Sequence, residues 1–283
     1  MTDLSNRALL VSLNVSQWTA RKLDKRETAD VTARNGAASN AARVNKSLLP
    51  LAASLEAVHT IAGSARTTFY KHSLPWANEG MRVIKADGYL GFTQLMSAHR
   101  SDWLKAVDTF VSDYPSLVAD AHLLLGGLYR AEDYPNPSDI ARKFSMDITF
   151  MPVPSANDWR ISLGDAEMDS LRRQITAKVQ ESQGVAMREA WDRLFKAVSS
   201  IKERVSDPDK RKFKGLLDCS IELCSILPTL NVADDPNLER MRRELEQSLT
   251  GVNSDALNAS PAYRSEVADK MTAIMDKMSS FYG

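Results

Sequence analysis

The sequence predicts a mainly α-helical protein with a small antiparallel β-sheet, an α+β fold built as a long-helix bundle with a coiled-coil arm. Three observations carry this prediction. Apolar residues alternate along two short segments, as they do in strands that bury one face. One long proline-free stretch repeats apolar residues at helical spacing. Three later stretches place a capping side chain directly before proline, which is typical of a helix start.

The first strand is expected over residues 8–16, where Leu9, Val11, Leu13 and Val15 alternate with their neighbours. An Ala-rich helical region follows from about 31 to 70, with a break at Asn35-Gly36. Pro50 starts or kinks a helix in this region, because proline lacks a backbone donor.

A short extended piece is expected over residues 81–84. Two helices then follow over 92–111 and 115–129. We expect them to be separated at Asp113-Tyr114-Pro115, because the residue before a proline disfavours the helical conformation.

The clearest strand signal lies within residues 143–152. Apolar and polar residues alternate there, and two prolines end the pattern. The apolar positions are Phe144, Met146, Ile148 and Phe150. Residues 158–163 repeat the alternation at Trp159, Ile161 and Leu163, which predicts a hairpin partner. Together with the first strand, these segments predict a sheet of three or four strands.

Asp165–Val205 is expected to be a long helix, with a kink or a change of packing partner near Gly184 as the alternative; if unbroken, it would extend roughly 60 Å at about 1.5 Å per residue. It carries two apolar stripes that meet near Gly184. The first stripe is Met168, Leu171, Ile175 and Val179. The second is Met187, Trp191, Leu194, Val198, Ile201 and Val205, and it has the alternating spacing of a coiled-coil seam.

Three later helices are expected to start at Asp207-Pro208, Asp235-Pro236 and Ser260-Pro261. The last one repeats the seam spacing at Val267, Met271, Ile274, Met278 and Phe281. We expect residues 1–164 to form a helical body with the small sheet. Residues 165–283 would form the coiled-coil-like half, unless the two make one continuous domain.

The two seams are the predicted surfaces for a protein partner and for self-association into a homo-oligomer. Their residues are Met187, Trp191, Leu194, Val198, Ile201, Val267, Met271, Ile274, Met278 and Phe281. For the Met-rich last helix three interpretations stay open, because methionine packs adaptably: a face for a partner helix, packing into the chain's own bundle, and self-association.

Composition and motifs exclude several classes of function. The 36 basic and 36 acidic residues give a formal net charge of zero, which argues against broad wrapping of duplex nucleic acid. The two cysteines rule out a disulfide scaffold, and neither a transmembrane run nor a signal core is visible, so a cytoplasmic protein is expected. No phosphate-binding loop or metalloprotease motif occurs, and four scattered histidines do not suggest a metal site. We therefore predict no catalytic residue, no cofactor and no metal.

A basic cluster offers an alternative function in nucleic-acid binding. It consists of Lys210, Arg211, Lys212, Phe213 and Lys214, in which the aromatic ring would stack on bases and the cations would follow phosphates. The competing interpretation is a solvated first helical turn with Phe213 packed inward. A second, diluted basic set is Arg21, Lys22, Lys25 and Arg26.

Two segments, Leu4–Leu23 and Lys143–Pro154 ahead of the long helix, resemble a family of tailed-phage and prophage proteins of unknown function. The resemblance covers most of the chain and rests on structural motifs. Genes of that family often lie near those for a MoxR-like AAA+ ATPase and a von Willebrand-type protein. The resemblance thus implies an accessory to a phage-encoded AAA+ ATPase in the bacterial host cytoplasm, and it assigns no functional residue.

The first hypothesis is accordingly a non-enzymatic helical scaffold or adaptor. The alternative is a nucleic-acid-binding accessory of phage DNA metabolism or anti-defence. An enzyme with a site assembled across helices and a structural role in the virion are the remaining hypotheses.

Overall fold

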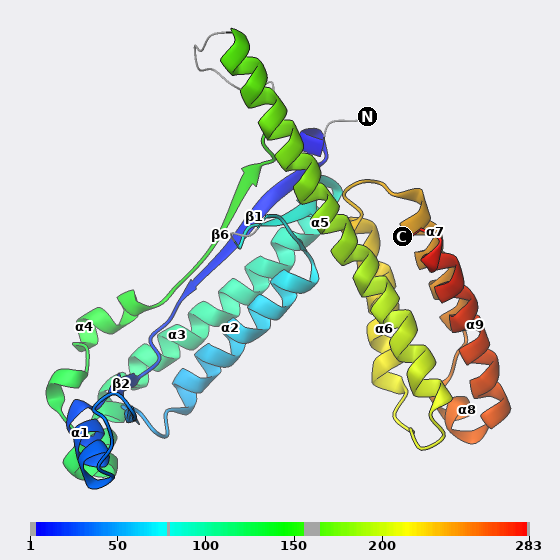
Figure 1. Cartoon of the computed structure of the whole chain (residues 1–283). Coiled ribbons are helices and arrows are strands. Elements are labelled where there is room, and N and C mark those ends of the chain that lie inside the picture. The colour runs from blue at the N-terminus through cyan, green and yellow to red at the C-terminus, as the bar shows by residue number, and fades with distance from the viewer. Residues whose placement is uncertain (1–3, 78–79, 156–164, 282–283) are drawn as a thin grey trace. The chain divides into compact units, whose positions relative to one another are not determined.

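The computed structural model describes residues 4–77, 80–155 and 165–281 (Figure 1). Its helices and its small antiparallel sheet confirm the predicted α+β class. The chain divides into two compact units. The first unit contains the described residues of Met1–Ser12, Tyr70–Thr93 and Thr149–Gly283, and the second contains Leu13–Phe69 and Gln94–Ile148. This division does not coincide with the predicted boundary after residue 164.

The four-stranded sheet has the order β4-β5-β1-β6. Its strands are β1 (Ala8–Ser16), β4 (Leu74–Pro75), β5 (Arg82–Lys85) and β6 (Ser145–Pro152). β1 and β5 are antiparallel, with Leu9 opposite Ile84. The predicted strands at 8–16 and 143–152 are confirmed, whereas the predicted hairpin partner at 158–163 lies outside the described residues. In β1, Leu10 is buried more deeply than Leu9, so the expected face is not the only covered one.

Helices of the first unit pack around one hydrophobic core. They are α5 (Asp165–Ser206), α6 (Lys214–Leu230), α7 (Pro236–Leu249), α8 (Ser254–Ala259) and α9 (Pro261–Ser279). α5 is one helix of 42 residues that runs unbroken through Gly184, which confirms the predicted long helix. Its second half packs most extensively against α9, which runs antiparallel to it (Figure 1). The stripe on its first half is only half-buried.

Two of the three predicted helix starts are confirmed. The Asp235 carboxylate accepts hydrogen bonds from the first-turn amides of α7, and the Ser260 hydroxyl accepts one from the Tyr263 amide of α9. The third prediction is wrong, because α6 begins at Lys214 rather than after Pro208. The Asp207 side chain instead accepts from the Asp209 amide at 3.0 Å and closes a turn. This turn uses the carboxylate that would have capped a helix.

The second unit holds α1 (Lys25–Arg34), α4 (Pro137–Ile140) and most of α2 (Ala53–Lys71) and α3 (Tyr89–Leu125). A two-stranded antiparallel sheet joins β2 (Arg21–Leu23) to β3 (Asn45–Ser47). The predicted break at Asn35-Gly36 is confirmed, since Asn35 caps α1 and Gly36 has a φ of 57°. Within this unit α2 and α3 lie side by side (Figure 1).

The predicted break before Pro115 is wrong, because α3 continues through this proline. A proline inside a helix costs about 3 kcal/mol, since it removes a hydrogen bond and crowds the preceding turn. Aromatic packing offsets that cost: Tyr114 and Phe110 are fully buried, with ring centroids 5.8 Å apart. The Tyr114 hydroxyl also donates to the Pro135 carbonyl at 2.8 Å. The local spacing of apolar residues does not reveal contacts of this kind.

We expect Leu194→Ala to lower the free energy of unfolding by about 2–5 kcal/mol, because the side chain is fully buried in the first unit and its removal leaves a cavity. Urea denaturation followed by circular dichroism measures the change. Leu90→Ala is the matched control, since Leu90 is 67% exposed and its truncation should stay within about 0.5 kcal/mol. Equal effects of the two substitutions would contradict the assigned core.

Candidate functional site

The predicted association surfaces lie inside the molecule, which corrects the sequence-based interpretation. Eight of the ten residues are buried, and the ridges of α5 and α9 pack against each other within one copy. The buried ones are Trp191, Leu194, Val198, Ile201, Val267, Met271, Ile274 and Met278. Met187 is half-buried against the same core, and Phe281 is 37% exposed. A heptad seam that is buried against another helix of its own chain leaves no apolar surface for a partner.

The basic cluster also differs from its nucleic-acid interpretation. Phe213 is 1% exposed, and the Arg264 guanidinium covers its ring at 5.1 Å from the centroid. The ring is therefore unavailable for stacking on bases. Its burial agrees with the competing interpretation, in which Phe213 packs inward. Lys210, Arg211, Lys212 and Lys214 are exposed, and Lys210 lies 4.0 Å from the Asp207 carboxylate.

Side chains suited to catalysis or metal binding are dispersed in the part of the chain that the structure describes. No group of three His, Cys, Asp or Glu residues is placed there to hold a metal ion. His59 contacts the Trp18 carbonyl, and His99 contacts the Thr68 hydroxyl. Burial raises the pKa of the Cys224 thiol to about 11, which makes it a poor nucleophile. Among the described helices, none has the length and apolar character that crossing a membrane requires.

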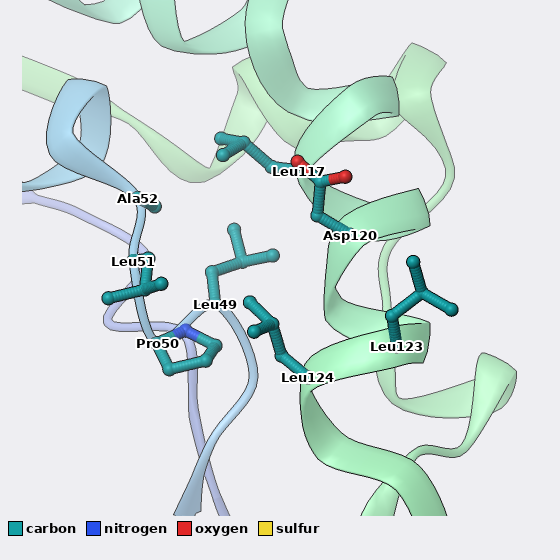
Figure 2. A pocket seen from close by; sticks show the side chains of 8 residues that line it. All are labelled: Leu49, Pro50, Leu51, Ala52, Leu117, Asp120, Leu123 and Leu124. Carbon is teal, nitrogen blue, oxygen red and sulfur yellow. The ribbon is translucent and has the colours of Figure 1, made fainter.

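An apolar pocket in the second unit is the strongest candidate for a functional site (Figure 2). One wall is the Leu49–Ala52 segment ahead of α2, and the other is the last third of α3, with a cavity of about 290 Å³ between them. Figure 2 shows the Leu49 side chain between the two walls and the Leu124 side chain pointing toward it from α3. We call these lining residues the leucine surface: Leu49, Pro50, Leu51, Ala52, Leu117, Asp120, Leu123 and Leu124.

Three leucines of this surface are unusually exposed. Leu51 is 76%, Leu123 80% and Leu124 53% exposed, whereas Leu49 and Ala52 beside them are buried. Contiguous exposed apolar surface is uncommon on monomeric proteins and typically marks an interaction site. The lining carries one charge, the Asp120 carboxylate, and no nucleophile or general base beside it.

Backbone contacts fix the first wall. The Leu48 amide donates to the Ala20 carbonyl at 2.7 Å, and the Leu48 carbonyl accepts from the Tyr134 hydroxyl at 2.8 Å. Burial raises the pKa of Tyr134 to about 12, so its hydroxyl stays a donor at neutral pH. With Leu48 held and Pro50 restricting the turn, Leu51 is directed outward.

A buried lysine ties the two walls together. Lys46 in β3 is only 7% exposed and donates to the Leu128 carbonyl, just beyond the end of α3, at 2.7 Å. Its Nζ lies 2.7 Å from Asp133 Oδ2 and 3.3 Å from Asp24 Oδ2. Asp133 also binds Lys22. The strand leading into Leu49–Ala52 is thereby fastened to the chain leaving α3.

The pKa shifts of Lys46, Asp133 and Asp24 agree with this arrangement. Burial alone would lower the pKa of Lys46, but the two carboxylates outweigh it and raise that pKa. Burial alone would raise the pKa of Asp133, yet Lys22 and Lys46 lower it. The Glu27 amide lowers the pKa of Asp24, with burial opposing this effect and Lys46 adding to it. All three groups are therefore charged near neutral pH.

A second, larger pocket of about 790 Å³ adjoins the leucine surface and shares its Leu49–Ala52 wall. Leu51 lines both pockets and is more exposed than Leu49 and Ala52 of the shared wall. The lining of the second pocket includes a cation, Arg21, and a carboxylate, Glu56. Neither Arg21 nor Asp120 has an ion-pair partner within the described residues, although Lys22 next to Arg21 has one.

The leucine surface was not predicted from the sequence. A signal existed in Leu123-Leu124-Leu125, since three consecutive residues span more than half of a helix circumference. A helix that buries one face must then expose at least one of them. The exposure of Leu51 was not predicted, because this residue fits the helical spacing of the apolar residues around it.

Comparison with family models, with curated proteins and with solved structures finds no match for this chain. The resemblance to the tailed-phage family therefore stays a prediction.

We expect Lys46→Met to lower the free energy of unfolding by about 3 kcal/mol, because it leaves the Asp24 carboxylate without its cation and Asp133 with Lys22 alone. The depressed pKa values of Asp24 and Asp133 add stability that is complete above their ordinary value of 3.8 and disappears as pH falls through the folded values. The variant should lose part of this acid dependence. Urea denaturation between neutral and acidic pH measures both effects.

Lys105→Met is the control, because Lys105 contacts Asp102 on the surface of α3, where an ion pair contributes little. A wild-type acid profile unchanged in Lys46→Met would contradict the role assigned to Lys46.

Proposed function

We propose that this protein is a non-enzymatic helical scaffold or adaptor whose copies associate through the leucine surface. The exposure of Leu51, Leu123 and Leu124 around an apolar pocket is the observation that carries the proposal. Association would remove these side chains from water, and each buried leucine contributes about 1.5–3 kcal/mol.

Shape and composition favour protein side chains over a small ligand as occupants. A cavity of about 290 Å³ lies at the lower limit of small-molecule sites. Such sites gather several polar groups that orient a ligand, whereas this lining offers the Asp120 carboxylate alone among charged groups. One or two apolar side chains from another protein surface suit it better.

Self-association is favoured because the surface is complementary to itself. A two-fold dimer brings the same patch of both copies together, so each feature must find its counterpart on the same patch. Leucines here can face leucines. Arg21 lies outside the leucine surface, in the adjoining pocket, so a dimer contact that extends over both pockets can place Asp120 of one copy against Arg21 of the other. Neither charge has an ion-pair partner within the described residues of one copy.

The scaffold would then present its remaining surface to a further protein. The AAA+ ATPase implied by the phage-family resemblance is the proposed partner, and this assignment rests on that resemblance alone. The proposal replaces the helical seams with the leucine surface as the means of association, since the seams are buried.

We expect the wild-type protein to be a dimer in light scattering at micromolar concentration, and Leu123→Asp to weaken dimerisation at least about tenfold by placing a carboxylate in the contact. Leu90→Asp is the matched control, because Leu90 lies on the same helix, is 67% exposed and does not line the pocket. A wild-type monomer, or equal losses in both variants, would defeat the proposal.

A charge exchange tests the pairing within the dimer. Asp120→Arg and Arg21→Asp should each weaken dimerisation by opposing like charges, and the double variant should restore it. Sedimentation equilibrium at low salt measures the three dissociation constants. A double variant no stronger than the single ones would refute the two-fold arrangement.

A further inference from the structure

A second kind of pocket lies in the first unit, where the end of α5 meets the start of α9. Its volume is about 620 Å³. Its walls include Arg211, Asn258, Arg264 and Ser265. The lining contains two guanidinium groups and no carboxylate, so the pocket is positively charged.

Arg264 is held rigidly in the wall. It is 7% exposed, its Nε donates to the Leu257 carbonyl, and its Nη1 donates to the Asp207 and Pro208 carbonyls at 3.3 and 3.4 Å. No hydrogen bond joins Nη2 to another described residue, so this end of the fork remains a donor. The ring of Phe213 supports the guanidinium plane from one side.

Arg211 supplies the second cation from the exposed loop before α6. It donates to the Pro208 and Lys210 carbonyls. Within the described residues neither Arg211 nor Arg264 forms an ion pair. Of the acidic residues near them in sequence, Asp207 contacts Lys210 and Glu266 contacts Lys270, while Asp209 lies within ion-pair distance of neither guanidinium. Neither guanidinium is therefore neutralised by an ion pair.

Asn258 adds an independent observation. The residue lines the pocket, and its Oδ1 lies beneath the pocket surface, shielded from water and without a hydrogen-bond partner among the described residues. A buried acceptor left in this state costs free energy and usually indicates a missing water, ion or ligand. A ligand that fills the pocket would need an O–H or N–H group at this point.

We propose that this pocket binds a hydroxylated phosphomonoester, with the phosphate on Arg211 and Arg264 and a hydroxyl donating to Asn258. Guanidinium groups match phosphate oxygens in geometry and charge. The volume is that of a small-ligand site, and a sugar phosphate fits within it. The phosphate belongs either to a free small molecule or to the 5′ end of a nucleic acid, which present the same chemistry.

Calorimetric titration with ribose 5-phosphate tests the proposal on the full chain. We expect a dissociation constant of about 1 mM or below, and no binding of ribose, which lacks the anion. Arg211→Gln should weaken binding about tenfold, because it removes a charge-assisted contact. No heat with ribose 5-phosphate at about 10 mM would overturn the proposal.

Lys212→Gln is the matched control for Arg211→Gln. It removes the same charge from an exposed neighbour that does not line the pocket, so binding should change less than about twofold. Equal losses in both variants would show diffuse attraction and overturn the site. Ser265→Glu, an exposed wall position on α9, should abolish binding by adding a carboxylate; unchanged binding would overturn the proposal.

A short oligonucleotide with and without a 5′-phosphate distinguishes the two sources. Tighter binding of the 5′-phosphorylated strand than of ribose 5-phosphate, lost in Arg211→Gln, supports the site with a nucleic-acid end as its ligand. Binding of ribose 5-phosphate alone supports it with a free small molecule. Equal binding of both strands that Arg211→Gln leaves unchanged would overturn it, because the phosphate group would then contribute nothing.

Discussion

The ammonium group of Lys46 is the contact on which the candidate site depends. It joins three stretches of the second unit: its own strand β3, the segment at Asp24, and the segment that contains the Leu128 carbonyl and Asp133. Removing a charge from water is costly, so a buried lysine persists only where partners satisfy its donors. The geometry around it is therefore narrowly defined. The Leu49–Ala52 wall comes just after this lysine in the chain, so the same contacts fix its position.

The two helical seams and the leucine surface show opposite outcomes for apolar side chains. The ridges of α5 and α9 face each other, so their leucines, valines and methionines make up the interior of one copy. Leu123 and Leu124 end a long helix where no described element covers them. Apolar character alone does not separate these cases. The apolar side chains of α5 are buried because α9, in the same chain, carries a ridge with matching spacing that packs against them. The exposed leucines of α3 have no such ridge opposite them among the described residues.

Sequence reasoning succeeded where a signal is local. The strands β1 and β6 are marked by alternating apolar residues, and two helix starts are marked by the capping residues Asp235 and Ser260. Each of these signals depends only on residues a few positions away. It failed where a distant contact decides. Aromatic neighbours keep α3 helical at Pro115, and a side-chain turn at Asp207 delays α6. The partner surface was misplaced for the same reason, because a seam looks alike whether its mate is α9 or another molecule.

The interleaving of the two units bears on how the chain is made. The polypeptide passes from one unit to the other after Ser12, Phe69, Thr93 and Ile148. A nascent chain leaving the ribosome cannot complete the second unit before Ile148 has emerged, and the first must wait for its C-terminal helices. Contacts across such separations form slowly, and the waiting intermediates expose apolar surface. No single truncation can therefore isolate either unit, because each is assembled from separate segments of the chain.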